Sequence, residues 1–222
     1  MILWLASYPR SGNTLCRLVM HQCFGAGSYS DQGNKFEKPV IGLGEESGLL
    51  EYDAEWENFY AHASPDSKLH LVKTHQHPCD DQPAIVILRD PRSSLCGYFH
   101  YLRRNCTHTQ FSLAQIIQGE VIYGGWIEFY KEWLNRNPAS TLLVYFEELA
   151  DLKPQTLARI SAFTGMVPIT YEGVDFEFLR GKNSGFFRSG HLSWKGDKEW
   201  TPAVEDLFRQ HFALELGKHG WI

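Results

Sequence analysis

The sequence predicts one α/β domain, residues 1–222, built as three layers of helices, sheet and helices around a mostly parallel central sheet. Short apolar runs of strand length recur along the chain, and helical patterns separate or follow them. No internal repeat, low-complexity tract or linker-like stretch divides the 222 residues. Alternation of this kind places parallel strands side by side with helices on both faces.

Four apolar runs have the length and composition of buried strands. The first, Ile2 to Ala6, is continuously apolar, as expected of a central parallel strand that is covered on both faces. The others are Leu69 to His75, Ala84 to Asp90, and TLLVYFEEL from Thr141. We expect these four runs to form the sheet.

Helical spacing of apolar residues follows or separates the strands. A first helix is predicted from Thr14 onward, with Asn13 as its capping residue. Four more are predicted at Arg92 to Arg104, Trp126 to Asn135, Pro154 to Phe163 and Pro202 to Leu216. Residues 25–65 and 181–199 lack clear periodicity, which is typical of substrate loops.

Composition and charge exclude several classes of protein. A net charge of -5 argues against a nucleic-acid binder, although a local anion pocket remains possible. No apolar run reaches the roughly 18 residues of a membrane span, and the apolar start is too short for a signal peptide. The five cysteines are odd in number and lack a CxxC pair, which favours reduced thiols over disulfides or a zinc site. We expect a cytoplasmic protein.

The loop after the first predicted strand has the residues of an anion site. Backbone amides and the positive end of the helix dipole favour an anion there, and Arg10 adds a charge. Gly12 allows close approach, and Ser11, Asn13 and Thr14 add short donors. The loop is not a Walker A motif, because it lacks that motif's first glycine and its lysine. The alternative is an ordinary turn with a surface arginine.

Four segments, in order, carry a family resemblance. SYPRSGNT resembles the 5′-phosphosulfate loop of soluble sulfotransferases that use 3′-phosphoadenosine 5′-phosphosulfate (PAPS), in which most familiar members have lysine in place of Arg10. LVKTHQHP resembles the segment with the catalytic histidine, here His75, preceded by Lys73. VILRDPRSSLCGYFHYLR resembles the strand and helix that grip the 3′-phosphate, with the family's arginine at Arg89. FFRSGHLSWK resembles the late cofactor loop.

The resemblance implies a P-loop-nucleotidase-like fold and a sulfotransferase that uses PAPS and releases adenosine 3′,5′-bisphosphate (PAP), with no metal. It implies catalytic roles for Arg10, Lys73 and His75. The implied cofactor-binding residues are Arg10, Ser11, Gly12, Asn13, Thr14, Arg89, Gly97, Phe146, Phe176, Arg188, Ser189 and Gly190. The acceptor is expected to be a hydroxyl or amine of a small molecule, and the protein a monomer or homodimer without nucleic-acid or membrane partners.

This chain departs from the family at several of these positions. Gly97 stands where a serine completes the 3′-phosphate grip, and Leu15 where a tryptophan often stacks on adenine. Phe146 replaces a tyrosine, Ser189 replaces a lysine, and the aromatic residue at Phe176 is retained. On this alignment we expect Gly97→Ser to tighten PAP binding, because the new hydroxyl would reach the 3′-phosphate.

The residues suit sulfuryl transfer, which resembles phosphoryl transfer in being an in-line displacement. Arg10 and the loop amides stabilise the leaving 5′-phosphate, Lys73 the sulfuryl group or the bridging oxygen, and His75 takes the acceptor's proton. Alternatives remain. The chain could be a nucleotide-dependent kinase with an atypical phosphate loop or a non-catalytic nucleotide-binding protein, and Arg92 could pair with Asp90 or contact a phosphate. His77 and Cys79 could join His75 as metal ligands, but no companion cluster supports this.

Overall fold

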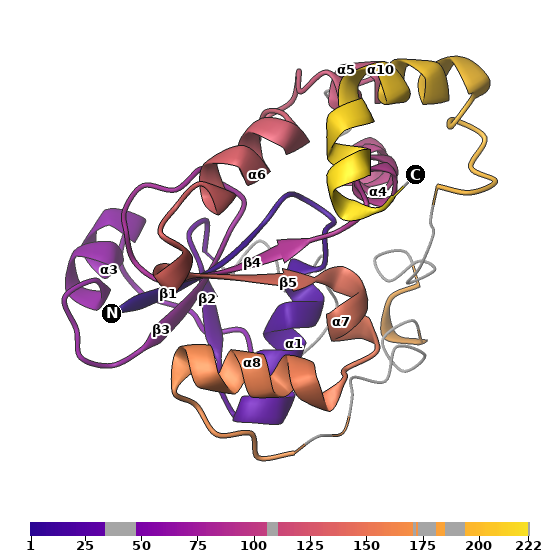
Figure 1. The fold of residues 1–222 in the computed structure, drawn as a ribbon. Coiled ribbons are helices and arrows are strands. Elements are labelled where there is room, and N and C mark those ends of the chain that lie inside the picture. The colour runs from indigo at the N-terminus through magenta and orange to yellow at the C-terminus, as the bar shows by residue number, and fades with distance from the viewer. Residues whose placement is uncertain (34–47, 106–110, 171, 173–180, 185–193, 222) are drawn as a thin grey trace.

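A five-stranded, all-parallel sheet forms the centre of the computed structural model, which describes residues 1–33, 48–105, 111–170, 172, 181–184 and 194–221 (Figure 1). The strand order is β2-β3-β1-β4-β5. The strands are β1 (Ile2–Ser7), β2 (Ser28–Ser30), β3 (His70–Thr74), β4 (Ala84–Leu88) and β5 (Thr141–Tyr145). The prediction of a three-layer α/β fold with a parallel sheet is confirmed.

The central strand β1 explains why its sequence is apolar throughout. It pairs with β3 on one side, from Ile2↔His70 to Ala6↔Thr74, and with β4 on the other. All six of its residues are buried, because helices cover both faces of the sheet. The carboxyl ends of β3, β1 and β4 therefore lie next to one another.

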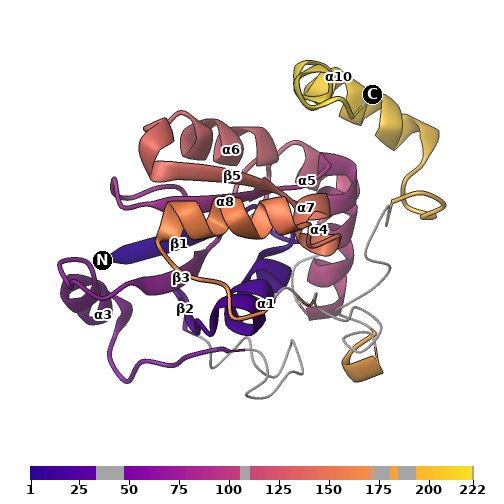
Figure 2. The same ribbon diagram turned by 60° about the horizontal axis from the view of Figure 1, so that its bottom comes forward.

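Two different sets of helices cover the two faces of the sheet (Figures 1 and 2). One face carries α1 (Asn13–Phe24), α7 (Phe146–Ala150) and α8 (Pro154–Thr164), which bury an aliphatic cluster against the sheet. The other face packs, through a cluster rich in aromatic rings, against α3 (Trp56–Ala63), α4 (Pro91–Asn105), α5 (Leu113–Ile117), α6 (Trp126–Leu134) and α10 (Pro202–His219). A single turn of 3-10 helix, η2 (Pro138–Ser140), precedes β5.

Two element ends differ from the sequence-based prediction, and two further elements were not predicted. The run from Thr141 is a strand only to Tyr145, where Glu148 Oε2 accepts the Tyr145 backbone N–H and starts α7. Helix α10 continues through Gly217 and ends at Gly220, which adopts the left-handed conformation. β2 and α3 were not predicted, because residues 25–65 show no apolar periodicity.

The described helices include none with the length and apolar character needed to span a membrane.

Candidate active site

Three strand ends bring Arg10, His75 and Arg89 together, although these residues are distant in sequence. The loop Tyr8–Gly12 follows β1, His75 follows β3, and Arg89 follows β4. His75 Nδ1 lies 2.6 Å from the Ser7 carbonyl oxygen, and Arg89 Nη1 donates to the Arg10 carbonyl oxygen over 3.1 Å. The loop after the central strand is thus held from both neighbouring strands.

The loop has a backbone conformation that few side chains tolerate. Arg10 has a φ of 65° and Gly12 a φ of 104°, both in the left-handed region. A Cβ at Gly12 would lie 2.6 Å from Phe146 Cδ2, so the space beside the loop is also closed. Gly12 is the N-cap of α1 and makes no side-chain cap, which leaves the amides of the first turn available for an anion.

The short polar side chains of the loop bind to the protein itself. Asn13 was predicted to cap α1, but its Nδ2 turns back to donate to Leu5 O (2.7 Å) and Ser7 Oγ (3.2 Å). The capping prediction is wrong, because Asn13 is already the first residue of the helix. Ser11 Oγ lies 2.9 Å from Ser94 Oγ, and both atoms are buried. These side chains brace the loop against β1 and α4.

The contact at Nδ1 determines the tautomer of His75. The Ser7 carbonyl oxygen is only an acceptor, so His75 Nδ1 carries the hydrogen. A neutral ring in this tautomer has its basic lone pair on Nε2. The half-buried imidazole also meets the Tyr123 ring at a centroid distance of 5.5 Å and an interplanar angle of 66°. The arrangement provides a base with a fixed orientation.

Lys73 is buried at the same strand end, with 7% of its surface exposed. Its backbone pairs with Leu5 of β1. Side chains alternate along a strand, so Lys73 lies on the same face as Leu71, which packs in the cluster beneath α1. An ammonium on that side of the sheet supplies positive charge near the loop.

Arg89 remains a cation despite its burial. Desolvation lowers the pKa of its guanidinium to about 10. The negative charges of Glu147 and Asp90 partly offset this effect, because each raises that pKa. The guanidinium carbon lies 4.0 Å from the centroid of the Phe146 ring. Phe146 therefore contacts both Gly12 and Arg89, which links the loop to the end of β4.

Arg10 extends along α4. A Cβ built on Gly97 would lie 3.3 Å from Arg10 Cβ and 3.7 Å from Arg10 Cγ, and the Arg10 guanidinium carbon is 5.8 Å from the Tyr101 ring centroid. The side chain of Arg10, which the sequence predicts to be an anion ligand, therefore passes over Gly97, the one glycine of α4.

Comparison with known proteins assigns the chain to a family. Residues 2–213 match the family model of the sulfotransferase domain. The chain belongs to the sulfotransferase domain family. A stretch of 87 residues is 34% identical to 3-alpha-hydroxysteroid sulfotransferase of Cavia porcellus and covers 36% of this chain but only 30% of that relative. Sulfotransferase 1A1 of Bos taurus is 21% identical over 252 aligned positions, which cover 96% of this chain and 83% of the relative.

Solved sulfotransferase structures share the fold. Mouse sulfotransferase SULT7A1 complexed with PAP superimposes with a TM-score of 0.64 at 20% identity, covering 97% of this chain and 84% of that one. Retinol dehydratase in a complex with retinol and PAP gives a TM-score of 0.65 at 20% identity, covering 95% of this chain and 81% of that one. The resemblance stated from the motifs is confirmed at the level of family and fold.

Arg92 binds residues of the carboxyl-terminal segment. Its Nε and Nη2 donate to the two carboxylate oxygens of Glu205 over 3.2 and 2.9 Å, and its Nη1 donates to the Trp221 carbonyl oxygen over 3.1 Å. Asp90 Oδ1 instead accepts the Arg92 backbone N–H over 2.7 Å at the start of α4. The predicted ion pair of Arg92 with Asp90 is therefore wrong, and Arg92 joins α4 to α10.

The predicted residues Phe176, Arg188, Ser189 and Gly190 lie outside the described residues. Two contacts to the loop were not found from sequence. Ser94 meets Ser11, and the Tyr130 hydroxyl accepts the Tyr8 backbone N–H over 3.3 Å. Tyr130 comes from α6, more than a hundred residues after the loop, and no local pattern signals such a contact.

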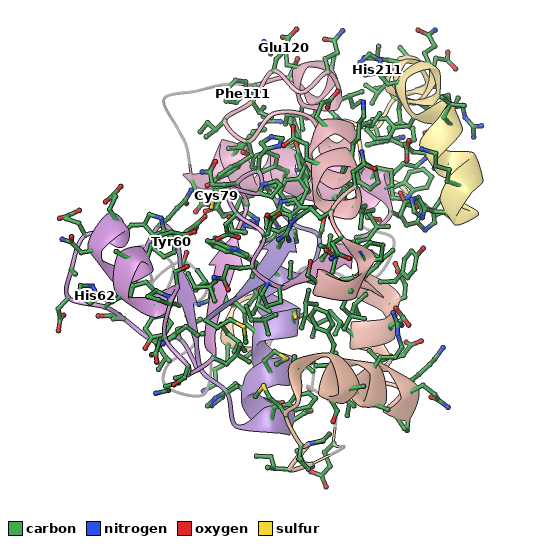
Figure 3. The ribbon with its side chains drawn as sticks, turned by 60° about the vertical axis from the view of Figure 1, so that its left-hand side comes forward. Tyr60, His62, Cys79, Phe111, Glu120 and His211 are labelled. Atoms are coloured by element: carbon green, nitrogen blue, oxygen red, sulfur yellow. The ribbon has the colours of Figure 1, made fainter. Side chains whose placement is uncertain are left out.

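In the part of the chain that the structure describes, the side chains of His75, His77 and Cys79 do not form a group of three possible ligand atoms within 4.8 Å of one another. His77 Nδ1 lies 2.8 Å from a carboxylate oxygen of α6, and the exposed Cys79 lies beside Tyr60 of α3 (Figure 3). Among the described residues, one group brings three possible ligand atoms within 4.8 Å of one another: Cys96, His100 and Asp197. In that group His100 Nε2 and Asp197 Oδ2 form an ion pair at 2.7 Å. This pair joins α4 to the carboxyl-terminal segment.

Proposed function

We propose that this protein is a cytoplasmic, single-domain sulfotransferase that moves a sulfuryl group from PAPS to a hydroxyl or amine of a small-molecule acceptor. The observation that carries the proposal is the convergence of an uncapped helix start, Arg10, Lys73, Arg89 and an oriented His75 at adjacent strand ends. Membership of the sulfotransferase family and the PAP in two structural neighbours support the nucleotide. No disulfide joins the described cysteines, which fits a reducing compartment.

The site fits a nucleotide that carries phosphate groups. The amides of the loop and of the first turn of α1, with the hydroxyl of Thr14, bind and orient the 5′ group. Arg89 and Arg188 bind the 3′-phosphate, and Phe146 fixes the Arg89 guanidinium from one side. Bound PAPS supplies the activated sulfuryl group. The arginines and Lys73 neutralise the anion, so the proposal needs no metal.

The proton path follows from the tautomer of His75. Nε2 takes the proton of the acceptor hydroxyl as the acceptor oxygen forms its bond to sulfur, and the bond from sulfur to the bridging oxygen breaks. Lys73 and Arg10 stabilise the negative charge that develops on the bridging oxygen and the leaving 5′-phosphate. Tyr123, packed against His75, forms an aromatic wall on the acceptor side.

Thermal shift assays with and without a chelator test the nucleotide class. PAP is expected to raise the melting temperature in the presence of the chelator, because a ligand that binds only the folded state stabilises it. ATP with magnesium is expected to do much less. A larger shift with magnesium ATP than with PAP would replace the sulfotransferase proposal with the kinase alternative.

Turnover with PAPS and a panel of simple phenols and aliphatic alcohols tests catalysis itself. Formation of PAP that depends on an acceptor supports the enzyme, whereas tight PAP binding without turnover of any acceptor supports the non-catalytic binding protein. Size-exclusion chromatography with light scattering tests the expectation of a monomer or homodimer.

A further inference from the structure

One face of α4 contacts the predicted phosphate-binding loop, Tyr8–Gly12, at three points. Ser94, Gly97 and Tyr101 are spaced by three and four residues, so they lie on the same side of the helix. Ser94 Oγ meets Ser11 Oγ at 2.9 Å, the Gly97 position meets the stem of Arg10, and the Tyr101 ring faces the Arg10 guanidinium at 5.8 Å. The middle point of this contact is a residue without a side chain.

We propose that Gly97 is a positioning residue of the nucleotide site, which acts by leaving space for the Arg10 side chain. The sizes of the residues at positions 10 and 97 are then coupled. A Cβ at position 97 would come within 3.3 Å of Arg10 Cβ, 3.7 Å of Cγ and 3.9 Å of Nε, so three atoms of one side chain pass over it. The proposed effect on nucleotide binding rests on the proposed function, whereas the coupling itself does not.

The loop has little room to yield to a new side chain. The nearest atom, Arg10 Cβ, is bonded directly to the backbone, whose φ of 65° already lies in the left-handed region. The Arg10 carbonyl oxygen accepts from Arg89, and the Ser11 N–H donates to the Tyr8 carbonyl oxygen over 3.1 Å. A larger residue at position 97 therefore moves the outer atoms of Arg10 and displaces its guanidinium.

This packing reverses the expectation from sequence for Gly97→Ser. A hydroxyl at position 97 would project from a Cβ that stands against the Arg10 stem, so it competes with Arg10 for the same space. Hydrogen bonds from a guanidinium to a phosphate are stronger than those from a neutral hydroxyl. The serine variant exchanges the stronger contact for the weaker one and binds PAP less tightly.

A double-mutant cycle tests the coupling with Gly97→Ser, Arg10→Ala and the double variant. PAP affinity is measured by calorimetry. The melting temperature of each variant is measured without ligand. Gly97→Ser is expected to weaken PAP binding about 10-fold in the presence of Arg10 but less than about 2-fold in the Arg10→Ala background, since alanine has no guanidinium to displace. Additive effects in both measurements, or tighter PAP binding by Gly97→Ser alone, would overturn the proposal.

Gly217 supplies a matched control for the effect of glycine on helix stability. It lies within α10, and a Cβ built there meets nothing within 4 Å. Gly217→Ala is expected to raise the melting temperature, because alanine favours a helix, whereas Gly97→Ala gains little or loses because of the contact with Arg10. An equal rise in both variants would show that position 97 has free space and would refute the proposal.

The two proposals fail in distinguishable ways. If the wild-type protein does not bind PAP, the proposed function fails, but the melting temperatures of the cycle and of the two alanine variants still report the coupling. If PAP binds and the cycle is additive, the proposed function stands and the coupling is wrong.

Discussion

The two sides of α4 contact the rest of the protein through different kinds of interaction. On the loop side the contacts are a pair of hydroxyls at Ser94, the bare surface of Gly97 and the ring of Tyr101. On the side of the carboxyl-terminal segment they are ion pairs, each with a partner about a hundred residues away. These pairs are Arg92 with Glu205, His100 with Asp197, and Arg103 with Glu199.

This difference separates two tasks within one helix. The loop side sets the position of a cation and of backbone amides through close packing, so under the proposed function it controls ligand binding and transfer. The other side attaches the carboxyl-terminal segment through charge, so it contributes to folding stability. The same division separates Arg89, which precedes α4 and contacts the loop, from Arg92, which lies in α4 and contacts α10.

The largest effect is expected at the loop side, from His75→Ala. Loss of the proposed general base should lower turnover by roughly 100-fold or more, about 2.7 kcal/mol in the barrier, while PAP affinity stays nearly unchanged. Steady-state kinetics and calorimetry measure the two quantities. His77→Ala is the matched control, because its imidazole lies two residues further on and contacts α6. Unchanged turnover in the His75 variant would show that another group is the base.

Arg92→Ala is expected to act on stability. The guanidinium is buried and paired with Glu205, whose side chain is 21% exposed, so its loss should cost about 2 kcal/mol of unfolding free energy. Arg103→Ala removes a pair whose side chains are 58% and 46% exposed and should cost under about 0.5 kcal/mol. Chemical denaturation distinguishes them. Equal losses would mean that the junction of α4 with α10 does not depend on the buried pair.

The smallest effect is a dependence of stability on acid. Burial opposes ionisation of Asp197, but hydrogen bonds from the Glu199 backbone, His100 and Cys96 hold the pKa of its carboxyl below the ordinary value of 3.8. A carboxyl with a lowered folded pKa stabilises the protein above its unfolded pKa, and this stability is lost as pH falls through the folded pKa. Melting temperatures should therefore fall below about pH 4.

Asp197→Asn should flatten that decline, and Asp151→Asn, at a carboxylate whose side chain is 50% exposed, should leave it unchanged. A decline of equal slope in wild type and Asp197→Asn would assign the acid sensitivity to other carboxyls, such as Glu205, whose pKa Arg92 and Trp200 lower against the effect of burial. That outcome would mean that the acid sensitivity comes from the pair of Arg92 with Glu205 and not from the pair of His100 with Asp197.

Local pattern explains which elements were predicted correctly. Four strands (β1, β3, β4 and β5) and five helices (α1, α4, α6, α8 and α10) follow from runs or periodicities that lie within each segment. β2, with the residues Ser28 to Ser30, carries no such pattern and forms because β3 offers it an edge. Asn13 looked like a cap because capping is read from neighbours in sequence, whereas its partners are carbonyl and hydroxyl oxygens of β1.

The sequence by itself determined four of the five strands, the main helices, and the motifs that place the chain among sulfotransferases, and it predicts the anion site in the loop after β1. These properties depend on residues within a few positions of one another. Only the tertiary structure decided that Arg92 binds α10, that Nδ1 of His75 is bonded to Ser7, and that Gly97 lies under Arg10. Each of these facts is a contact between segments distant in sequence, and packing of the folded chain selects the partner.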